Sequence, residues 1–313
     1  MRGYLVKRIL ATIPVMMVVA IFVFSLLRLT PGDPAAIIAG DYANPKDVVQ
    51  IRQKLGLDEP LYMQIGIWMS QLLRGDLGTS IFSGLPVTQL ITQRLEPTLA
   101  LTLFTLIIAI GLAIPLGTLA AYHVGTWIDR GVMIFAVLGF SLPVFWLGFI
   151  LIYAFAMQLS ILPVQGYVHL SHGLLLFLKH LILPALTLGL VYTALIARMT
   201  RASMLEVLQE DYIRTAYAKG ARSWSIVVRH ALKNAALPVV TIIGVGFARL
   251  IGGAVVTESV FALPGLGRLT VDAILHRDYP VIQGMILVVP GMYVMVNLLI
   301  DLAYAFLDPR IRY

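Results

Sequence analysis

The stretch Thr98–Tyr122, with the sequence TLALTLFTLIIAIGLAIPLGTLAAY, decides the fold class of this chain. It is apolar almost throughout and carries no charged residue. A helix needs about 20 apolar residues to cross a hydrocarbon core about 30 Å thick. The stretch is therefore predicted to be a transmembrane helix.

Further stretches on either side repeat this pattern. They are Ile9–Leu29, Met133–Leu159, Leu181–Ala197, Pro238–Thr257 and Val281–Leu299. Apolar residues make up 59% of the 313 positions and charged residues only 12%, whereas a soluble domain carries about 25% charged residues. We therefore predict an all-α, polytopic membrane protein with six transmembrane helices.

The first of these stretches also has features of a signal peptide, because Arg2, Lys7 and Arg8 precede it. It is longer than the apolar core of a signal peptide, and no small-x-small cleavage site follows it. We interpret Ile9–Leu29 as the first membrane span.

The distribution of charge predicts the orientation of the chain. If the N-terminus is cytoplasmic, the basic residues on the inner side are Arg2, Lys7, Arg8, Arg130, Arg198, Arg201, Arg214, Lys219, Arg222, Arg229, Lys233, Arg310 and Arg312. The acidic residues there are fewer: Asp129, Glu206, Glu210, Asp211 and Asp308. The thirteen basic and five acidic residues give the inner side a net charge of +8, so the whole excess of +7 in the chain lies there, as the positive-inside bias requires. Both termini are therefore predicted to be cytoplasmic. Because this charge is spread over short loops, it does not indicate nucleic-acid binding.

Two connections are longer than a bundle of helices needs. The outer segment 30–97 has a turn signal, PGDP at 31–34, and a helical pattern around Asp47–Leu55. It is predicted to be a small external subdomain, which serves either as a docking or gating surface or as a cap on the bundle. The inner connection, 198–234, is called the coupling loop below.

The coupling loop begins with the pattern of an amphipathic helix. Its apolar face is predicted to carry Leu205, Leu208, Tyr212 and Ala216. Glu206, Glu210 and Arg214 recur four residues apart, so Glu210 and Arg214 are expected to pair. Gly220 is expected to end the helix.

Such a helix could lie in the lipid interface. The acidic pair Glu210-Asp211 and the small residues Ala216 and Ala218 suit contact with a protein better than contact with anionic lipid. We therefore interpret it as a docking helix for a soluble cytoplasmic partner, and a bulky residue at Gly220 is expected to uncouple that partner.

Residues 210–220, EDYIRTAYAKG, resemble the coupling segment of binding-protein-dependent ABC importer permeases, and more narrowly of the dipeptide, oligopeptide and nickel group. Further strings agree with that family in the family's order. They are PGDP at 31–34, LGLD at 55–58, GDLG at 75–78, ASML at 202–205, PGLGR at 264–268, RDYP at 277–280 and DPRIR at 308–312. The general signature of these permeases has Glu-Ala-Ala where this chain has Arg214-Thr215-Ala216. Gly220 is therefore the position of this segment at which the family's residue role is carried over most directly.

The resemblance implies a type I ABC importer permease in a prokaryotic inner membrane. It implies a homologous second permease as heterodimer partner, two cytoplasmic ATPase subunits that bind ATP and Mg²⁺, and an external substrate-binding protein. No phosphate-binding loop motif occurs in this chain, which is expected to have no catalytic residue and no cofactor of its own. The residues assigned to ATPase coupling are Glu210, Asp211, Tyr212, Arg214, Thr215, Ala216, Ala218, Lys219 and Gly220.

The expected organisation has four parts. Residues 1–29 form the first transmembrane helix, residues 30–97 the external segment, residues 98–307 a five-helix permease core that contains the coupling loop, and residues 308–313 a cytoplasmic tail. The implied substrates are dipeptides or short oligopeptides, moved by alternating access, with nickel complexes and glutathione as alternatives within the family.

Arg249 and Glu258 are the candidate pore or substrate residues. Arg249 lies near the middle of the predicted fifth span, where a charged side chain costs about 3 kcal/mol or more and indicates a cavity. An ion pair with Asp301 or Glu258 is an equally weighted alternative.

Several other functions are disfavoured by the sequence. The chain has no cysteine, and its closest histidines, His169 and His172, have no further ligand nearby, so no metal site is expected. No nucleophile, base and orienting group cluster as in a membrane enzyme. A secondary transporter should show intramembrane carboxylates and an internal repeat, and neither is evident.

Overall fold

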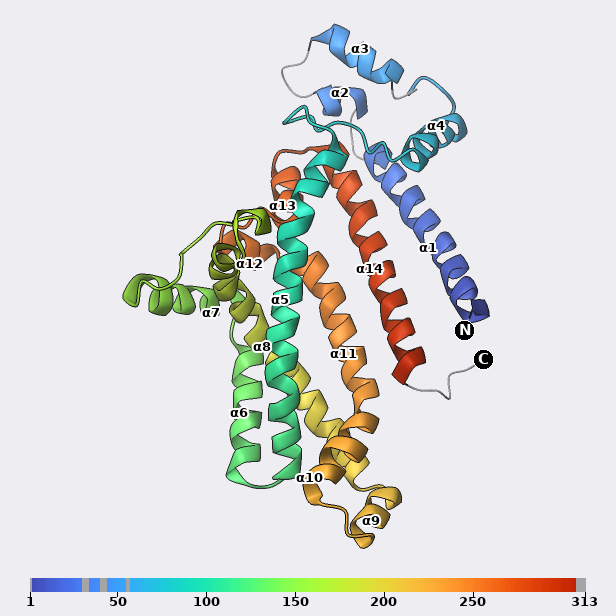
Figure 1. Cartoon of the computed structure of the whole chain (residues 1–313). Helices are drawn as coiled ribbons and strands as arrows, with labels where there is room; N and C mark the ends of the chain where they lie inside the picture. Colours follow the sequence, from blue (N-terminus) through green and yellow to red (C-terminus); the bar gives the residue numbers. More distant parts are fainter. Residues whose placement is uncertain (1, 30–33, 40–43, 55–56, 308–313) are drawn as a thin grey trace. The chain divides into compact units, whose positions relative to one another are not determined.

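A computed structural model describes residues 2–29, 34–39, 44–54 and 57–307 (Figure 1). Apart from one isolated β-bridge between Thr79 and Pro86, these residues form helices and loops. The predicted all-α fold is therefore confirmed.

The helices follow one another along the chain in this order: α1 Arg2–Leu29, α2 Pro34–Ala39, α3 Pro45–Lys54, α4 Leu61–Leu73, α5 Val87–Tyr122, α6 Trp127–Ser141, α7 Val144–Leu151, α8 Leu174–Leu208, α9 Asp211–Ala218, α10 Ser223–Ser225, α11 Leu232–Gly253, α12 Val255–Val260, α13 Leu266–Leu275 and α14 Tyr279–Leu307. Two π-helical turns, Ile152–Gln158 and Ile226–Ala231, and one 3₁₀ turn, Leu170–His172, complete them. The helical stretch expected around 47–55 is α3.

The predicted count of six spans is not confirmed. Within the described residues, four helices are long and apolar enough to cross a membrane: α5, α8, the helical run that ends with α11, and α14. A fifth span results if α6 and the helix that follows it are counted together, and α1 contains a shorter apolar helical stretch, Leu10–Ser25.

The predicted third span, Met133–Leu159, is not one straight helix. The chain bends by 105° between α6 and the helix Val144–Gln158. Leu142 is extended, with ψ of 132°, and Pro143 follows it. Proline disfavours the helical conformation of the residue before it, and at Leu142 the helix ends and a new one starts in another direction.

The chain forms two compact units. The first contains Met1–Glu96 with Gly265–Met295. In its core the start of α5 packs through Val87 and Ile91 against α13 and the start of α14. The buried Asp278 lies between those two helices and accepts a hydrogen bond from Ser80 Oγ at 2.5 Å and one from the Ile81 N–H at 3.2 Å. This carboxylate fixes the loop before α5.

The second unit contains Pro97–Pro264 with Val296–Tyr313, and α8 is its central helix. One side of α8 packs on α6 and α7, and another on α11. Small residues bring the helices close: a Cβ atom at Gly117 of α5 would lie 2.6 Å from the Ala197 carbonyl oxygen of α8. Such close approach is typical of helix packing in membranes, where small residues line the contacts.

Candidate functional site

The coupling loop is built by two helices and the turn between them. Helix α8 continues to Leu208, well beyond the predicted end of the fourth span at Ala197. The chain then turns at Gln209 and Glu210, and α9 begins at Asp211. Glu210 has extended backbone, with ψ of 146°. The predicted continuous helix through residues 205–216 was wrong, because this turn separates α8 from α9.

One buried side chain anchors α9. Ile213 is fully buried and belongs to a cluster with Met204 of α8 and with Ile226 and Val227 of the following π-helical turn. Ala216 packs against the same cluster. Burial of an isoleucine side chain contributes about 1.5–3 kcal/mol, so this contact stabilises the packing of α9 against α8 and the start of α11. The expected apolar residue Tyr212 lies outside this core.

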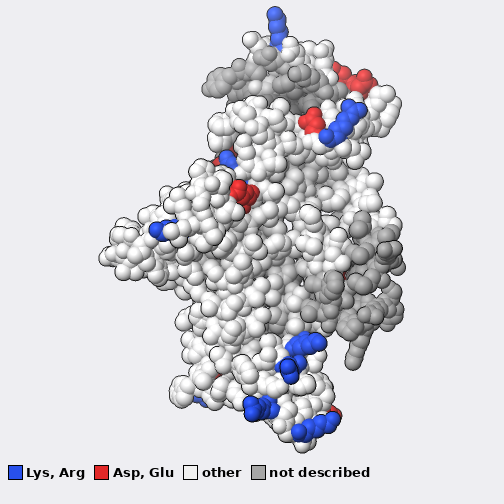
Figure 2. Space-filling view, in the orientation of Figure 1, with Lys and Arg blue, Asp and Glu red and all other residues white. Residues whose placement is uncertain are grey.

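The exposed side of α9 and the segment that follows it, from α10 to the start of α11, carry aromatic and charged side chains. Tyr212, Tyr217 and Trp224 are 42%, 47% and 62% exposed. Exposed basic residues surround them: Arg214, Lys219, Arg222, Arg229 and Lys233. Figure 2 shows lysine and arginine atoms gathered at this end of the unit. Tyr, Trp and Arg are the residues that dominate binding energy at protein interfaces, so this face has the composition of a docking surface.

Arg214 pairs with a different acid from the one expected. Its Nη1 lies 3.2 Å from Asp211 Oδ1, whereas Glu210 precedes the helix and is exposed. The predicted pairing of Glu210 with Arg214 was therefore wrong, because α9 starts one residue after Glu210. Both side chains of the observed pair are exposed, and such pairs contribute less than about 1 kcal/mol.

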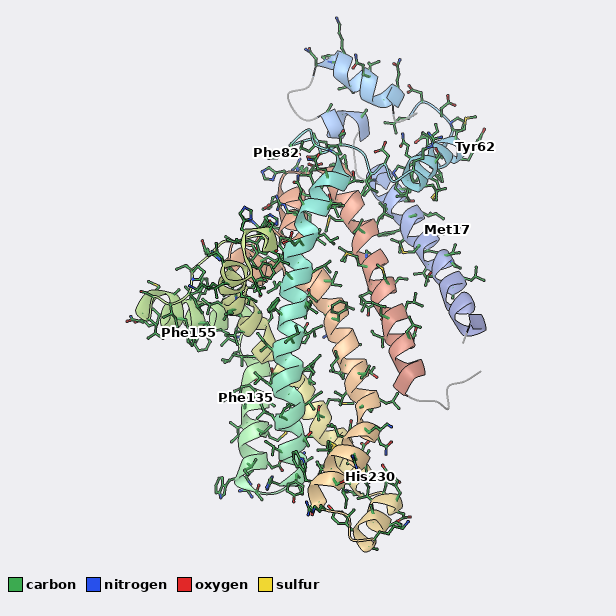
Figure 3. The ribbon with its side chains drawn as sticks, in the orientation of Figure 1. Met17, Tyr62, Phe82, Phe135, Phe155 and His230 are labelled. Carbon is green, nitrogen blue, oxygen red and sulfur yellow. The ribbon has the colours of Figure 1, made fainter. Side chains whose placement is uncertain are left out.

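The remaining assigned residues lie along the same short helix. Thr215 donates its hydroxyl to the Asp211 carbonyl oxygen at 3.0 Å. Ala218 and Lys219 are exposed at the end of α9. Tyr212 Oη accepts a hydrogen bond from Asn234 Nδ2 at 2.8 Å, and the same amide donates to the carbonyl oxygen of His230. His230 is labelled in Figure 3. This bond ties α9 directly to α11.

Gly220 ends α9 with a conformation that other residues rarely adopt. Its φ is +76°, and its N–H donates to the Tyr217 carbonyl oxygen at 2.9 Å. The next N–H, of Ala221, reaches back to the Ala216 carbonyl oxygen at 3.2 Å. Helices commonly end with a glycine in the left-handed conformation, followed by a backbone hydrogen bond that reaches back to the last turn. The prediction that Gly220 terminates the helix is confirmed.

A second link joins α6 to α8 at Arg201, near the start of the coupling loop. Arg201 binds Asp129 through two parallel contacts, Nε to Oδ1 at 2.5 Å and Nη2 to Oδ2 at 2.8 Å. The Gly125 N–H also donates to this carboxylate. Asp129 is buried, so the pair is held in a fixed geometry. Sequence reasoning used both residues only to orient the chain, because a pairing across 72 positions leaves no local signal.

Arg249 lines a cavity in the second unit. The cavity has a volume of about 200 Å³ and lies between α6, α8 and α11. Its walls are otherwise apolar and aromatic: Phe140, Val144, Leu188, Val191, Tyr192, Leu195 and Leu250. Helix α11 ends at Gly253, so Arg249 lies about one turn from a helix end and not in the middle of an unbroken helix over 238–257.

Glu258 is placed elsewhere. It lies in α12, is 1% exposed, and accepts a hydrogen bond from Thr98 Oγ1 at 2.7 Å. It does not line the cavity around Arg249. Within the described part of the chain, Arg249 makes no ion pair, and no group of three or more His, Asp or Glu residues is arranged to hold a metal ion.

Sequence reasoning did not identify Tyr192, which lies beside Arg249. The two residues line the same cavity, and a Cβ atom at Gly246 would lie 2.9 Å from Tyr192 Cε1. A tyrosine within an apolar span carries no signal of its own. Gly246 lies one helical turn from Arg249 and is the position where the Tyr192 ring comes close to α11. This glycine is the sequence signal that could have indicated the contact.

Two family models match nearly the whole chain. The model described as binding-protein-dependent transport system inner membrane component matches residues 113–313. The model for the N-terminal membrane component of the same systems matches residues 1–102.

Curated relatives match over the full length. A probable peptide ABC transporter permease of Sinorhizobium fredii is 53% identical over 99% of both chains. The dipeptide transport system permease protein DppB of Alkalihalophilus pseudofirmus is 42% identical, and the glutathione transport system permease protein GsiC of Escherichia coli is 44% identical, each over 100% of both chains.

Among solved structures, the inward-facing MetNI methionine ABC transporter contains a similar chain. The TM-score is 0.58 at 19% identity, and the match covers 70% of this chain and 97% of that one. At this identity the likeness establishes the fold.

Proposed function

The chain belongs to the family of binding-protein-dependent transport system inner membrane components, and we propose that it is the permease subunit through which an ATP-driven importer moves dipeptides or short oligopeptides. The substrate class is supported by the peptide and dipeptide permeases among its full-length relatives. We also propose that the chain itself hydrolyses nothing.

The observation that carries the proposal is the construction of α9. Its inner face is anchored by Ile213 to α8 and to the segment before α11, its outer face presents Tyr217 to solvent, and Trp224 of the following helix α10 is exposed as well. A partner that binds the outer face moves α8 and α11 with it, because Ile213 is buried against them and Tyr212 Oη accepts a hydrogen bond from Asn234 of α11. We assign this face to an ATPase subunit, with ATP and Mg²⁺ bound by that subunit.

Alternating access follows from this arrangement. Closure of two ATPase subunits shifts the two α9 helices of a permease pair toward each other and tilts the attached helices. The bundle then needs two packings whose relative free energies are biased by the ATPases and by the loaded external binding protein. A homologous second permease completes the pore.

The chain is placed in the inner membrane with both termini and the coupling loop in the cytoplasm. The basic side chains around α9 and the start of α11 support this orientation, because basic residues accumulate on the cytoplasmic side of membrane proteins. In this orientation segment 30–97 is external, residues 98–307 form the permease core, and residues 308–313 are cytoplasmic.

Glutathione is the second candidate substrate. The glutathione permease of Escherichia coli is about as similar to this chain as the dipeptide permease of Alkalihalophilus pseudofirmus. Selection between the two rests on the external binding protein, so a transport assay with that protein is required.

The test is uptake into proteoliposomes that contain this chain, its second permease and both ATPases, with the binding protein outside. Labelled dialanine should enter only when ATP is present at the ATPases, and omission of the ATPases should abolish uptake. Import of glutathione but not of dialanine would favour the second candidate. Uptake driven by an ion gradient without ATPases would overturn the proposal.

A further inference from the structure

Two neighbouring cavities form one groove along α8 in the second unit. The cavity that contains Arg249 shares Phe140 and Leu195 with a smaller one of about 130 Å³ that reaches Arg198. We call these two cavities together the α8 groove. Its α8 wall is formed by residues that recur every three or four positions from Leu188 to Arg198, which places them on one face of the helix.

Arg249 is exposed on this face. A charged side chain on an apolar helix costs about 3 kcal/mol or more against lipid, so this face must meet water or another polar group in the working protein. No acidic residue lines either cavity, and Arg249 makes no ion pair within the described residues. The guanidinium is therefore available to an anionic group from outside this chain.

The ring of Tyr192, beside Arg249, packs against the backbone of α11 at Gly246. Gly246 and Arg249 lie three residues apart on one side of α11, and the absence of a side chain at Gly246 admits the Tyr192 ring. The cavity around Arg249 thus has one cation and one hydroxyl in an otherwise apolar lining, and the smaller cavity adds Arg198 and Ser141 at the other end of the groove. Ligand sites have this composition: a mostly apolar lining with a few placed polar groups.

We propose that the α8 groove receives the peptide during translocation and that Arg249, with Tyr192 beside it, binds the C-terminal carboxylate of that peptide. The inference rests on the proposed peptide transport and deepens it. Guanidinium groups bind carboxylates through two parallel hydrogen bonds. Every peptide with a free C-terminus carries this carboxylate whatever its side chains, so one arginine can hold substrates of different sequence.

The test compares dialanine with dialanine amide, which lacks the carboxylate charge. Both are delivered at saturating concentrations of the binding protein to the complete importer in proteoliposomes. Uptake is measured for the wild type, Arg249→Gln, Arg249→Lys and the control Lys179→Gln. The control removes a positive charge from an exposed position of α8 that lines neither cavity.

A charge-assisted hydrogen bond corresponds to a factor of about ten or more. The ratio of acid to amide uptake should therefore fall about tenfold in Arg249→Gln, fall less in Arg249→Lys, and stay unchanged in Lys179→Gln. Use of the ratio removes any preference of the binding protein, since that protein is the same in every assay.

Several outcomes would overturn the inference. An unchanged ratio of acid to amide uptake in Arg249→Gln would overturn it, even if total uptake is retained. If uptake of both peptides falls equally, the ratio is also unchanged, and Arg249 would then be assigned to an ion pair with the second permease. A wild-type importer that moves neither peptide would overturn the proposed peptide transport, and the inference with it. A wild type that moves both peptides at an unaltered ratio in every variant would overturn the inference alone.

Discussion

Gly220 is the residue in the coupling loop whose chemistry is most constrained. Its φ of +76° lies in the region that favours glycine, yet a Cβ atom there would meet no atom within 4 Å. Any effect of substitution therefore comes from backbone strain, about 1–2 kcal/mol for a residue with a side chain, and not from a clash.

We predict that Gly220→Val uncouples ATP hydrolysis from transport. The strain is relieved when the end of α9 rotates, which moves the exposed face away from its partner. The measurement is the ratio of peptide imported to ATP hydrolysed in proteoliposomes. Gly131→Ala is the matched control, because Gly131 is helical and also has open space at its Cβ position. Unchanged coupling in Gly220→Val would count against the role assigned to α9.

The ion pair of Asp129 with Arg201 differs from the surface pairs in the same chain. Removal of one partner from a buried pair leaves an uncompensated charge. The Arg201 side chain is partly exposed, so we predict that Asp129→Asn lowers the free energy of unfolding in detergent by about 1–3 kcal/mol. Asp58→Asn, which removes the partner of Arg52 in a pair with both side chains exposed, should change it by less than about 0.5 kcal/mol. Equal effects of the two substitutions would contradict the structural role of the buried pair.

At the scale of elements, α9 has two faces with separate tasks. Ile213 supports the helix from inside, Tyr217 lies on its exposed face, and the exposed Trp224 follows in α10. Loss of a buried isoleucine side chain costs about 2–5 kcal/mol, whereas loss of an exposed aromatic side chain affects stability little.

We predict that Tyr217→Ala with Trp224→Ala weakens ATPase binding by about 30-fold, which corresponds to about 2 kcal/mol, without lowering stability. Ile213→Ala should lower stability as well as binding. Affinity is measured between the detergent-solubilised permease pair and the purified ATPases. Tyr62→Ala in α4, also strongly exposed, should leave affinity unchanged. If the double variant Tyr217→Ala with Trp224→Ala binds the ATPases as tightly as the wild type does, the docking surface lies elsewhere.

Elements also show where sequence reasoning stopped. Pro115, Pro184, Pro238 and Pro290 all lie inside continuous helices, whereas Pro143 stands at a bend of 105°. The local chemistry of proline is the same in each case, so the packing of neighbouring helices decides whether the helix continues. The turn at Gln209 and Glu210 contains no glycine or proline, so no local signal predicted it. Here too, the packing of neighbouring helices decides where the helix ends.

At the scale of the whole molecule, the sequence predicted the fold class well, because membrane thickness fixes the length of an apolar helix. The helical character of the coupling loop and the end of α9 at Gly220 could also be predicted, since both depend on local pattern. The groove around Arg249 and Tyr192 could not, because it joins side chains of α6, α8 and α11 that are far apart in sequence. The hydrogen bond between Thr98 and the buried Glu258 could not be predicted either, because it also joins residues far apart in sequence.

The central claim is that α9 meets an ATPase in the cytoplasm. The chain has no cysteine, so Tyr217→Cys introduces a single thiol into this subunit on the exposed face of α9. Labelling with a membrane-impermeant maleimide should occur in inverted membrane vesicles stripped of the ATPases, fall when the ATPases are added back, and be absent in right-side-out vesicles. Labelling of Cys at this position from the outside, or labelling that the ATPases do not reduce, would contradict the claim.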